Sequence, residues 1–150
     1  MSRDISHEVH EVAVEVAPND IDELGHVNNV IYLRWVQDAA VSHWRSATTE
    51  EEQKNVVWVV VRHEIDYKRP ARLGDAVVVK TWVGEATEAA FERYTDIVRK
   101  SDGAVLAKAL TLWCPLNART GRIVRIPDDL RNRFSTAKKE SLAGSSGGRR

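Results

Sequence analysis

The sequence predicts an α+β fold in which an antiparallel sheet of about five strands wraps around one long helix. Residues 28–47 carry apolar side chains at spacings of three and four and contain no Gly or Pro, which indicates a helix. Alternating or Val-rich segments precede and follow this helix, as strands do. An open sheet of so few strands has exposed edges, which a second copy of the chain would cover most simply.

The elements follow one another in a simple order. Residues 8–16 alternate between apolar and polar side chains, which is typical of a half-buried strand, and a Pro-Asn-Asp turn cluster at residues 18–20 ends it. The helix of residues 28–47 is apolar on several sides, so we expect it to be buried against more than one surface. Residues 48–55 are polar and predict a loop.

Four further strands complete the predicted sheet, over residues 56–67, 76–83, 91–100 and 105–114, and a short helical turn is expected over residues 128–132. In the first of these strands, Val59 and Val61 are expected on the buried face. In the last, Leu106, Leu110 and Leu112 occupy alternate positions and are expected to face the core.

Length and composition bound the class of protein. The 150 residues predict a single domain over residues 1–135, followed by a flexible polar tail over residues 136–150. Lys plus Arg and Asp plus Glu both number 22, and this neutral balance argues against nucleic-acid binding. The longest apolar run, Val56–Val61, is far shorter than the roughly 20 residues of a membrane span. The N-terminus lacks the apolar stretch of a secretory signal, so we expect a cytoplasmic protein without membrane insertion.

The metal-ligating residue types are sparse. Cys114 is the single cysteine, which excludes an intrachain disulfide and a thiolate metal cluster. His7 and His10 lack a second set of ligands at metal spacing. We therefore predict no metal and no cofactor, and we expect Cys114 to be a buried, unreactive thiol.

The chemistry-bearing residues concentrate just before the helix. Between Asp20 and Asn29 the chain holds three carboxylates, one His, two Asn and Gly25. A helix N-terminus offers unpaired amides and the positive end of a dipole, which suit a carbonyl oxygen that gains negative charge. A nearby carboxylate can attack that carbonyl or activate water. These parts suit acyl transfer or hydrolysis, although Asp and Asn before a helix also serve as plain turn and cap residues.

A resemblance to a known family rests on this same segment. Asp22-x-x-Gly25-His26-Val27-Asn28-Asn29-x-x-Tyr32 resembles the signature of hotdog-fold acyl thioesterases of the 4-hydroxybenzoyl-CoA thioesterase type. The segment is also similar to that of plant acyl-ACP thioesterases. A second block, residues 65–75, resembles the family's strand-turn-strand motif, and the likeness covers roughly residues 10–134. It implies a hotdog fold, a homodimer or tetramer, and hydrolysis of an acyl-CoA, or possibly acyl-ACP, thioester.

The resemblance also implies roles for individual residues. Asp22 is the expected nucleophile or general base, His26 is expected to take part in catalysis, and amides near Gly25, His26 and Val27 are expected to polarise the thioester carbonyl. Capping and pocket shaping are expected from Asn28, Asn29 and Tyr32. Apart from the resemblance, Trp58 and Tyr32 are aromatic residues that could line an acyl pocket. Coenzyme A enters only as part of the substrate.

Other readings stay open. Asp22 and His26 could serve a hotdog hydratase or dehydratase, or the protein could bind acyl thioesters without turning them over. Asp38, on the helix, is the second candidate acid. His63 is expected to be a hydrogen-bonded core residue, and His43 is expected to be structural, toward the helix C-terminus where a positive group suits the dipole. The Arg side chains that could meet a coenzyme A phosphate are Arg62, Arg69, Arg72, Arg93 and Arg99.

Overall fold

The computed structural model describes residues 8–87 and 90–134. The described elements follow in the order β1 (His10–Glu15), η1 (Pro18–Asp20), α1 (Asn29–Ala47), α2 (Glu50–Asn55), β2 (Val56–Tyr67), β3 (Ala76–Ala86), β4 (Phe91–Arg99) and β5 (Val105–Asn117), and a further helical segment covers residues 128–134. The predicted polar tail of residues 136–150 lies outside the described residues. No helix in the described part of the chain is long and apolar enough to cross a membrane.

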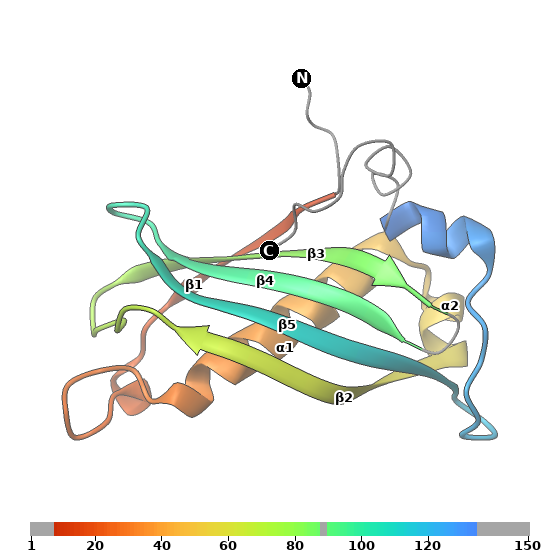
Figure 1. Cartoon of the computed structure of the whole chain (residues 1–150), viewed down its shortest axis with the longest axis horizontal. Helices are drawn as coiled ribbons and strands as arrows, with labels where there is room; N and C mark the ends of the chain where they lie inside the picture. Colours follow the sequence, from red (N-terminus) through yellow and green to blue (C-terminus); the bar gives the residue numbers. More distant parts are fainter. Residues whose placement is uncertain (1–7, 88–89, 135–150) are drawn as a thin grey trace.

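The five strands form one antiparallel sheet in the order β1-β3-β4-β5-β2. Figure 1 shows α1 lying across one face of this curved sheet, with β1 and β2 at its two edges. The helix has 19 residues and is therefore about 28 Å long. This arrangement, with a sheet wrapped around a central helix, confirms the predicted α+β hotdog fold.

The main core lies between α1 and the inner face of the sheet. Tyr32, Trp35, Val36 and Ala39 project from the helix onto Val77, Val79, Ile97, Leu106, Ala107 and Ala109 of the strands. The helix lies closest to β3 and β1, and the β5 side chains Ala107 and Ala109 complete the core. The buried side chains of α1 thus determine which face of each strand is buried.

Two predictions about strand faces are wrong in part. On β5 the predicted burial of Leu106 is confirmed, but Leu110 and Leu112 are half-buried on the outer face and Ala107, Ala109 and Thr111 face inward. The register between β4 and β5 shifts between the pairs Ile97–Ala107 and Val98–Val105, and this irregularity at Leu106 moves the alternation by one residue. On β2 an irregularity at Val61 separates the pairs Val60–Trp113 and Arg62–Leu112. This bulge shifts the alternation by one residue, so Val59 and Val61 are exposed rather than buried.

The polar segment before β2 is also not the predicted loop, since it contains α2. Thr49 caps this helix: its hydroxyl accepts from the Glu52 amide at 3.1 Å, and the Glu52 carboxylate accepts from the Thr49 amide at 2.9 Å. This reciprocal pair satisfies two otherwise unpaired amides. The predicted helical turn near residue 128 is confirmed and continues to residue 134. The side chain of Arg133 joins it to α2 through two contacts of 3.0 Å with the Glu52 carboxylate.

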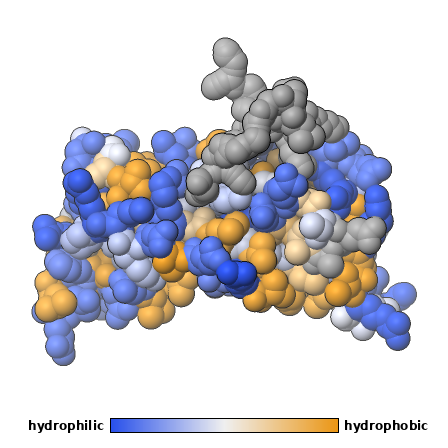
Figure 2. All heavy atoms as spheres, in the orientation of Figure 1, coloured by the Kyte–Doolittle hydropathy of each residue, from blue (hydrophilic) through white to orange (hydrophobic). Residues whose placement is uncertain are grey.

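Apolar side chains also gather along the outer edge of the sheet. Val57, Val59 and Val61 of β2 are 46%, 40% and 58% exposed. Figure 2 shows apolar surface along the lower rim of the molecule, where β2 lies in Figure 1. An edge strand with exposed Val side chains is suited to pairing with another strand.

Candidate active site

The segment before α1 folds into a tight loop. Ile21 and Val27 pair as an isolated antiparallel bridge, and inside it the Asp22 amide donates to the His26 carbonyl at 2.8 Å. Gly25 closes the turn with φ of 80° and donates to the Asp22 carbonyl at 3.1 Å. Only glycine adopts this left-handed conformation without steric cost. The loop therefore places Asp22 and His26 opposite each other.

The Asp22 carboxylate is held by the backbone of its own loop. One oxygen, Oδ1, accepts from the Leu24 amide at 2.8 Å and from the His26 amide at 3.2 Å. The other oxygen has no hydrogen-bond partner among the described residues, and the side chain is only half-buried. Asp22 is thus an oriented carboxylate with one oxygen left to react.

Asp20, two residues earlier, serves the scaffold. It is 9% exposed, and its Oδ2 accepts from the Ala17 amide at 2.9 Å. Its carbonyl accepts from the Asn28 amide at 2.8 Å, which joins the loop to the start of α1. Of Asp20 and Asp22, only Asp22 is therefore available to a ligand.

At the start of α1, one backbone amide has a side-chain acceptor and another has no acceptor among the described residues. Asn28 is the N-cap, and its side-chain oxygen accepts from the Val30 amide at 3.0 Å. The amides of Gly25 and His26 donate to Asp22, and the Val27 amide donates to the Ala71 carbonyl at 2.9 Å. From Gly25 to Ile31, the amide of Asn29 is the one that has no acceptor within residues 8–87 and 90–134.

An exposed Arg lies beside the loop. Arg72 Nη2 is 3.5 Å from His26 Nε2, and since a guanidinium only donates, Nε2 is the acceptor in this contact. The His26 ring makes no hydrogen bond with the Asp22 carboxylate; that carboxylate is bonded to the His26 backbone instead. Of the five candidate phosphate ligands, the structure brings Arg72 to this loop.

The other candidate cations have different surroundings. Arg62 pairs with Glu64, and Arg99 contacts Asp75 at 3.5 Å and Asp102 at 3.2 Å. Arg69 is exposed on the segment after β2. Arg93 is buried inside the sheet and faces the other end of α1.

Tyr32 and Tyr67 hold the start of α1 against the segment around Ala71. Tyr32 is 2% exposed, its hydroxyl accepts from the Ala71 amide at 2.9 Å, and burial raises its pKa. The Tyr67 ring meets it edge-on at 5.3 Å, and the Tyr67 hydroxyl donates to the Asn29 carbonyl at 3.2 Å. These contacts join the segment around Ala71 to the helix start. The positions of the Val27 and Asn29 amides therefore depend on residues about forty positions later in the chain.

Trp58 does not join this cluster. It lies against Trp44, near the C-terminal end of α1, with ring centroids 5.4 Å apart. Asp38 is exposed on the middle of α1. The structure therefore brings together Asp22, Gly25, His26, Val27, Asn28, Asn29 and Tyr32, and separates Trp58 from them.

The two other candidate His residues are structural. His63 Nδ1 lies 3.0 Å from the Thr111 hydroxyl, which confirms the expected hydrogen bond, and burial lowers its pKa. His43 is fully buried, and burial, with smaller contributions from Arg93 and His10, lowers its pKa to about 3. The prediction that His43 is structural agrees with this burial, but His43 adds no positive charge near the helix C-terminus, because a buried imidazole beside a guanidinium stays neutral.

Comparison with known proteins agrees with this geometry. The chain is 31% identical over 108 residues to a chloroplastic palmitoyl-acyl carrier protein thioesterase of Gossypium hirsutum, which covers 66% of this chain and 26% of that protein. The chain thus spans about a quarter of the length of this plant relative. It is 24% identical over 131 residues to the long-chain acyl-CoA thioesterase FadM of Escherichia coli, covering 84% of this chain and 97% of FadM.

Solved structures share the fold. A Thermus thermophilus thioesterase complexed with coenzyme A and Zn superposes with a TM-score of 0.75 at 29% identity, covering 87% of this chain and 94% of that one. The 1,4-dihydroxy-2-naphthoyl-CoA thioesterase Slr0204 of Synechocystis superposes with a TM-score of 0.73 at 19% identity, covering 84% and 95%. Residues 16–134 match the sequence pattern of the family, and with the fold and the loop geometry this shows that the chain belongs to the Thioesterase-like superfamily.

Proposed function

We propose that this protein is an acyl-CoA thioesterase that hydrolyses an acyl thioester to the free acid and coenzyme A. The observation that carries the proposal is the Asp22 carboxylate, which two loop amides hold at Oδ1 while its second oxygen has no partner among the described residues. A carboxylate in this state is suited to attack or to proton abstraction. Family membership supports the same reaction class.

The Asn29 amide is the proposed donor to the thioester carbonyl. It points from the first turn of α1, where the helix dipole is positive and the neighbouring amides already have acceptors. A donor that is fixed before the reaction stabilises the oxyanion without reorganising. The Tyr67 contact to the Asn29 carbonyl holds this peptide segment in place.

Two routes through Asp22 have balanced chemistry. In the first, a carboxylate oxygen bonds to the carbonyl carbon, the C–S bond breaks, and the thiolate takes a proton from solvent; water then cleaves the mixed anhydride and restores Asp22. In the second, Asp22 takes a proton from a water that attacks the carbonyl, and the departing thiolate receives that proton. Both routes release one acid and one thiol per water consumed.

Coenzyme A is the proposed thiol carrier. FadM, an acyl-CoA thioesterase, matches over nearly its whole length, whereas the plant acyl carrier protein thioesterase matches over about a quarter of its length. The Thermus thermophilus relative binds coenzyme A. Arg72, exposed beside His26, is a suitable contact for a phosphate of this carrier.

The proposed assembly is a homo-oligomer formed through β2. This edge strand exposes Val57, Val59 and Val61, and a second copy of β2 would bury them while pairing the open backbone edge. The expected cytoplasmic location stays a prediction. A hydratase or dehydratase would need a working carboxylate–imidazole pair, and the geometry does not favour one, since Asp22 bonds to the backbone of His26 rather than to its ring.

Thiol release from a panel of acyl-CoA and acyl-ACP thioesters tests the proposal. We expect release by the wild-type protein, and a loss of several orders of magnitude in Asp22→Asn. Glu23→Gln is the matched control, because it removes an exposed carboxylate from the neighbouring position of the same loop. Equal rates in wild type and Asp22→Asn would exclude Asp22, and binding of all thioesters without release would indicate a binding module.

A further inference from the structure

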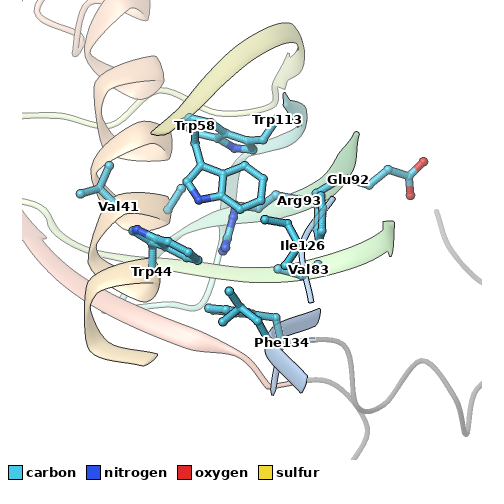
Figure 3. A pocket seen from close by; sticks show the side chains of 12 residues that line it. Val41, Trp44, Trp58, Val83, Glu92, Arg93, Trp113, Ile126 and Phe134 are labelled. Carbon is cyan, nitrogen blue, oxygen red and sulfur yellow. The ribbon is translucent and has the colours of Figure 1, made fainter. Parts of the chain in front are cut away.

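A second candidate site lies at the other end of α1. A pocket of about 70 Å³ opens between the C-terminal half of α1, the inner face of the sheet and the helix of residues 128–134. Figure 3 shows its aromatic wall, and the rings that line it are Trp44, Trp58, Phe91, Trp113 and Phe134. Ala40 and Trp44 follow Asn29 by 11 and 15 positions, so the pocket lies about 16–22 Å along the helix from the Asp22 loop.

The rings form a connected wall. Trp58 meets Trp44 edge-on at 5.4 Å and Phe91 edge-on at 5.0 Å, and Phe134 stacks on Trp44 at 6.0 Å. Edge-to-face contacts of this kind stabilise aromatic clusters beyond their buried area. The wall is therefore preformed. Its space equals about two water molecules at roughly 30 Å³ each, so a single ring enters it in part and the rest of the ring lies at the open mouth.

Two indole N–H groups in this wall have no acceptor. Nε1 of Trp58 and Nε1 of Trp113 are both buried without a hydrogen-bond partner in the described part of the chain. An unsatisfied buried donor costs about 1–3 kcal/mol, and native structures rarely keep one without a reason. The two oxygens of a ligand carboxylate would supply the missing acceptors.

A buried positive charge lines the same pocket. Arg93 is 7% exposed, and its Nη1 donates to His43 Nδ1 at 3.0 Å and to the Thr81 hydroxyl at 3.1 Å. Burial lowers its pKa to about 10, so it stays charged at neutral pH. Both of these partners are neutral, and a buried cation without a paired anion is costly.

The nearby carboxylates do not neutralise Arg93 directly. No Asp or Glu within residues 8–87 and 90–134 forms an ion pair with Arg93. Glu8 acts on it from a distance, and its half-exposed carboxylate contacts His43 Nε2 at 3.3 Å. Glu92 lines the rim, but its carboxylate accepts from the Tyr94 hydroxyl at 3.1 Å and points away from the rings in Figure 3.

We propose that this pocket binds a small carboxylic acid with an aromatic or compact apolar body. The body lies among the rings, and the carboxylate accepts hydrogen bonds from the Arg93 guanidinium and the indole N–H groups. This site goes beyond the proposed function, because it uses none of the residues around Asp22. Thioester hydrolysis releases a carboxylic acid, so the product class and the ligand class of this pocket coincide.

Binding of benzoate and phenylacetate, measured by calorimetry and tryptophan fluorescence, tests the proposal. Benzamide and phenylacetamide are the matched neutral probes, since they keep the ring and lose the charge. We expect each acid to bind at least about tenfold more tightly than its amide, because charge-assisted hydrogen bonds are roughly twice as strong as neutral ones. The protein is full-length Asp22→Asn, so the result does not depend on whether the thioesterase proposal holds.

Two variants locate the site. Trp58→Phe keeps a ring and removes one N–H, so we expect it to weaken benzoate binding several-fold and to leave benzamide binding nearly unchanged. Trp82→Phe is the control, because Trp82 stacks on Tyr94 outside the pocket. Equal affinity for acid and amide, no binding of either acid at millimolar concentration, or equal weakening by both variants would each overturn the proposal.

Discussion

Replacing Asn29 by Pro would delete the amide that we assign to the thioester carbonyl while leaving α1 in place. Asn29 is the first helical residue, a position where Pro is common because its fixed φ suits the helix and no intrahelical bond is lost. The preceding residue must then avoid the helical region, and Asn28 already has φ −61° and ψ 138°. The backbone therefore accepts the change without rearrangement.

The expected magnitudes differ sharply between activity and stability. Removing one oxyanion donor in comparable enzymes costs about 2.7–4 kcal/mol of transition-state stabilisation, or a factor of about 10²–10³ in kcat. The Asn29 amide bonds to no described residue and its side chain is exposed, so the free energy of unfolding should change by no more than about 0.5 kcal/mol.

The assay compares wild type, Asn29→Ala and Asn29→Pro in thiol release from the best acyl-CoA of the panel. Asn29→Ala loses the side chain and keeps the amide, so the ratio between the two variants isolates the N–H group. We expect the ratio to appear in kcat rather than in KM, since the oxyanion develops only in the transition state. Urea unfolding, followed by tryptophan fluorescence, checks that both variants are folded.

One result would refute this reasoning. If Asn29→Pro is as stable as Asn29→Ala and its kcat lies within about threefold, less than 1 kcal/mol, the Asn29 amide does not hold the carbonyl. The donor would then have to come from another group, with the loop rearranging on substrate binding.

Further predictions concern stability and assembly. Unfolded His43 takes up a proton near pH 6.5 but the folded residue only near pH 3, so lowering the pH from 7.5 to 5.0 should cost wild type about 2 kcal/mol of unfolding free energy that His43→Gln does not lose. Arg133 lowers the pKa of Glu52 to about 2, so wild type should exceed Glu52→Gln in urea stability above about pH 4.5, with the difference vanishing toward pH 2. Leu106→Ala should lower the unfolding free energy by about 2–5 kcal/mol, and a loss below 1 kcal/mol would contradict its full burial. Val59→Lys should convert the oligomer to monomer in light scattering, whereas an unchanged mass would place the interface elsewhere.

The sequence predicted those parts of the molecule that rest on short-range patterns. The apolar stripe of α1, the five strands and the turn at Gly25 follow from periodicity and backbone preference, both of which act over a few residues. The capping pair of Thr49 and Glu52 was also visible, and it could have revealed α2 within a segment that looked like a loop.

The prediction of which strand face is buried was wrong where contacts between distant parts of the chain decide the burial. Alternation predicted buried Val59 and Val61, but the bulge at Val61 depends on how β2 registers against β5. On β5 the irregularity at Leu106, which depends on how β4 and β5 register, keeps Leu106 in the core and turns Leu110 and Leu112 to the outer face.

By itself, the sequence determined the candidate catalytic loop. The hydrogen bonds that orient Asp22, and the one by which Asn28 caps α1, join residues no more than four positions apart. Only the tertiary structure decided that Asn29 has an amide without an acceptor, that His43 is neutral, and that Trp58 belongs to a pocket at the far end of the helix. Arg93 and His43 are fifty positions apart, and their charge states follow from desolvation, which arises only when distant segments exclude water from each other.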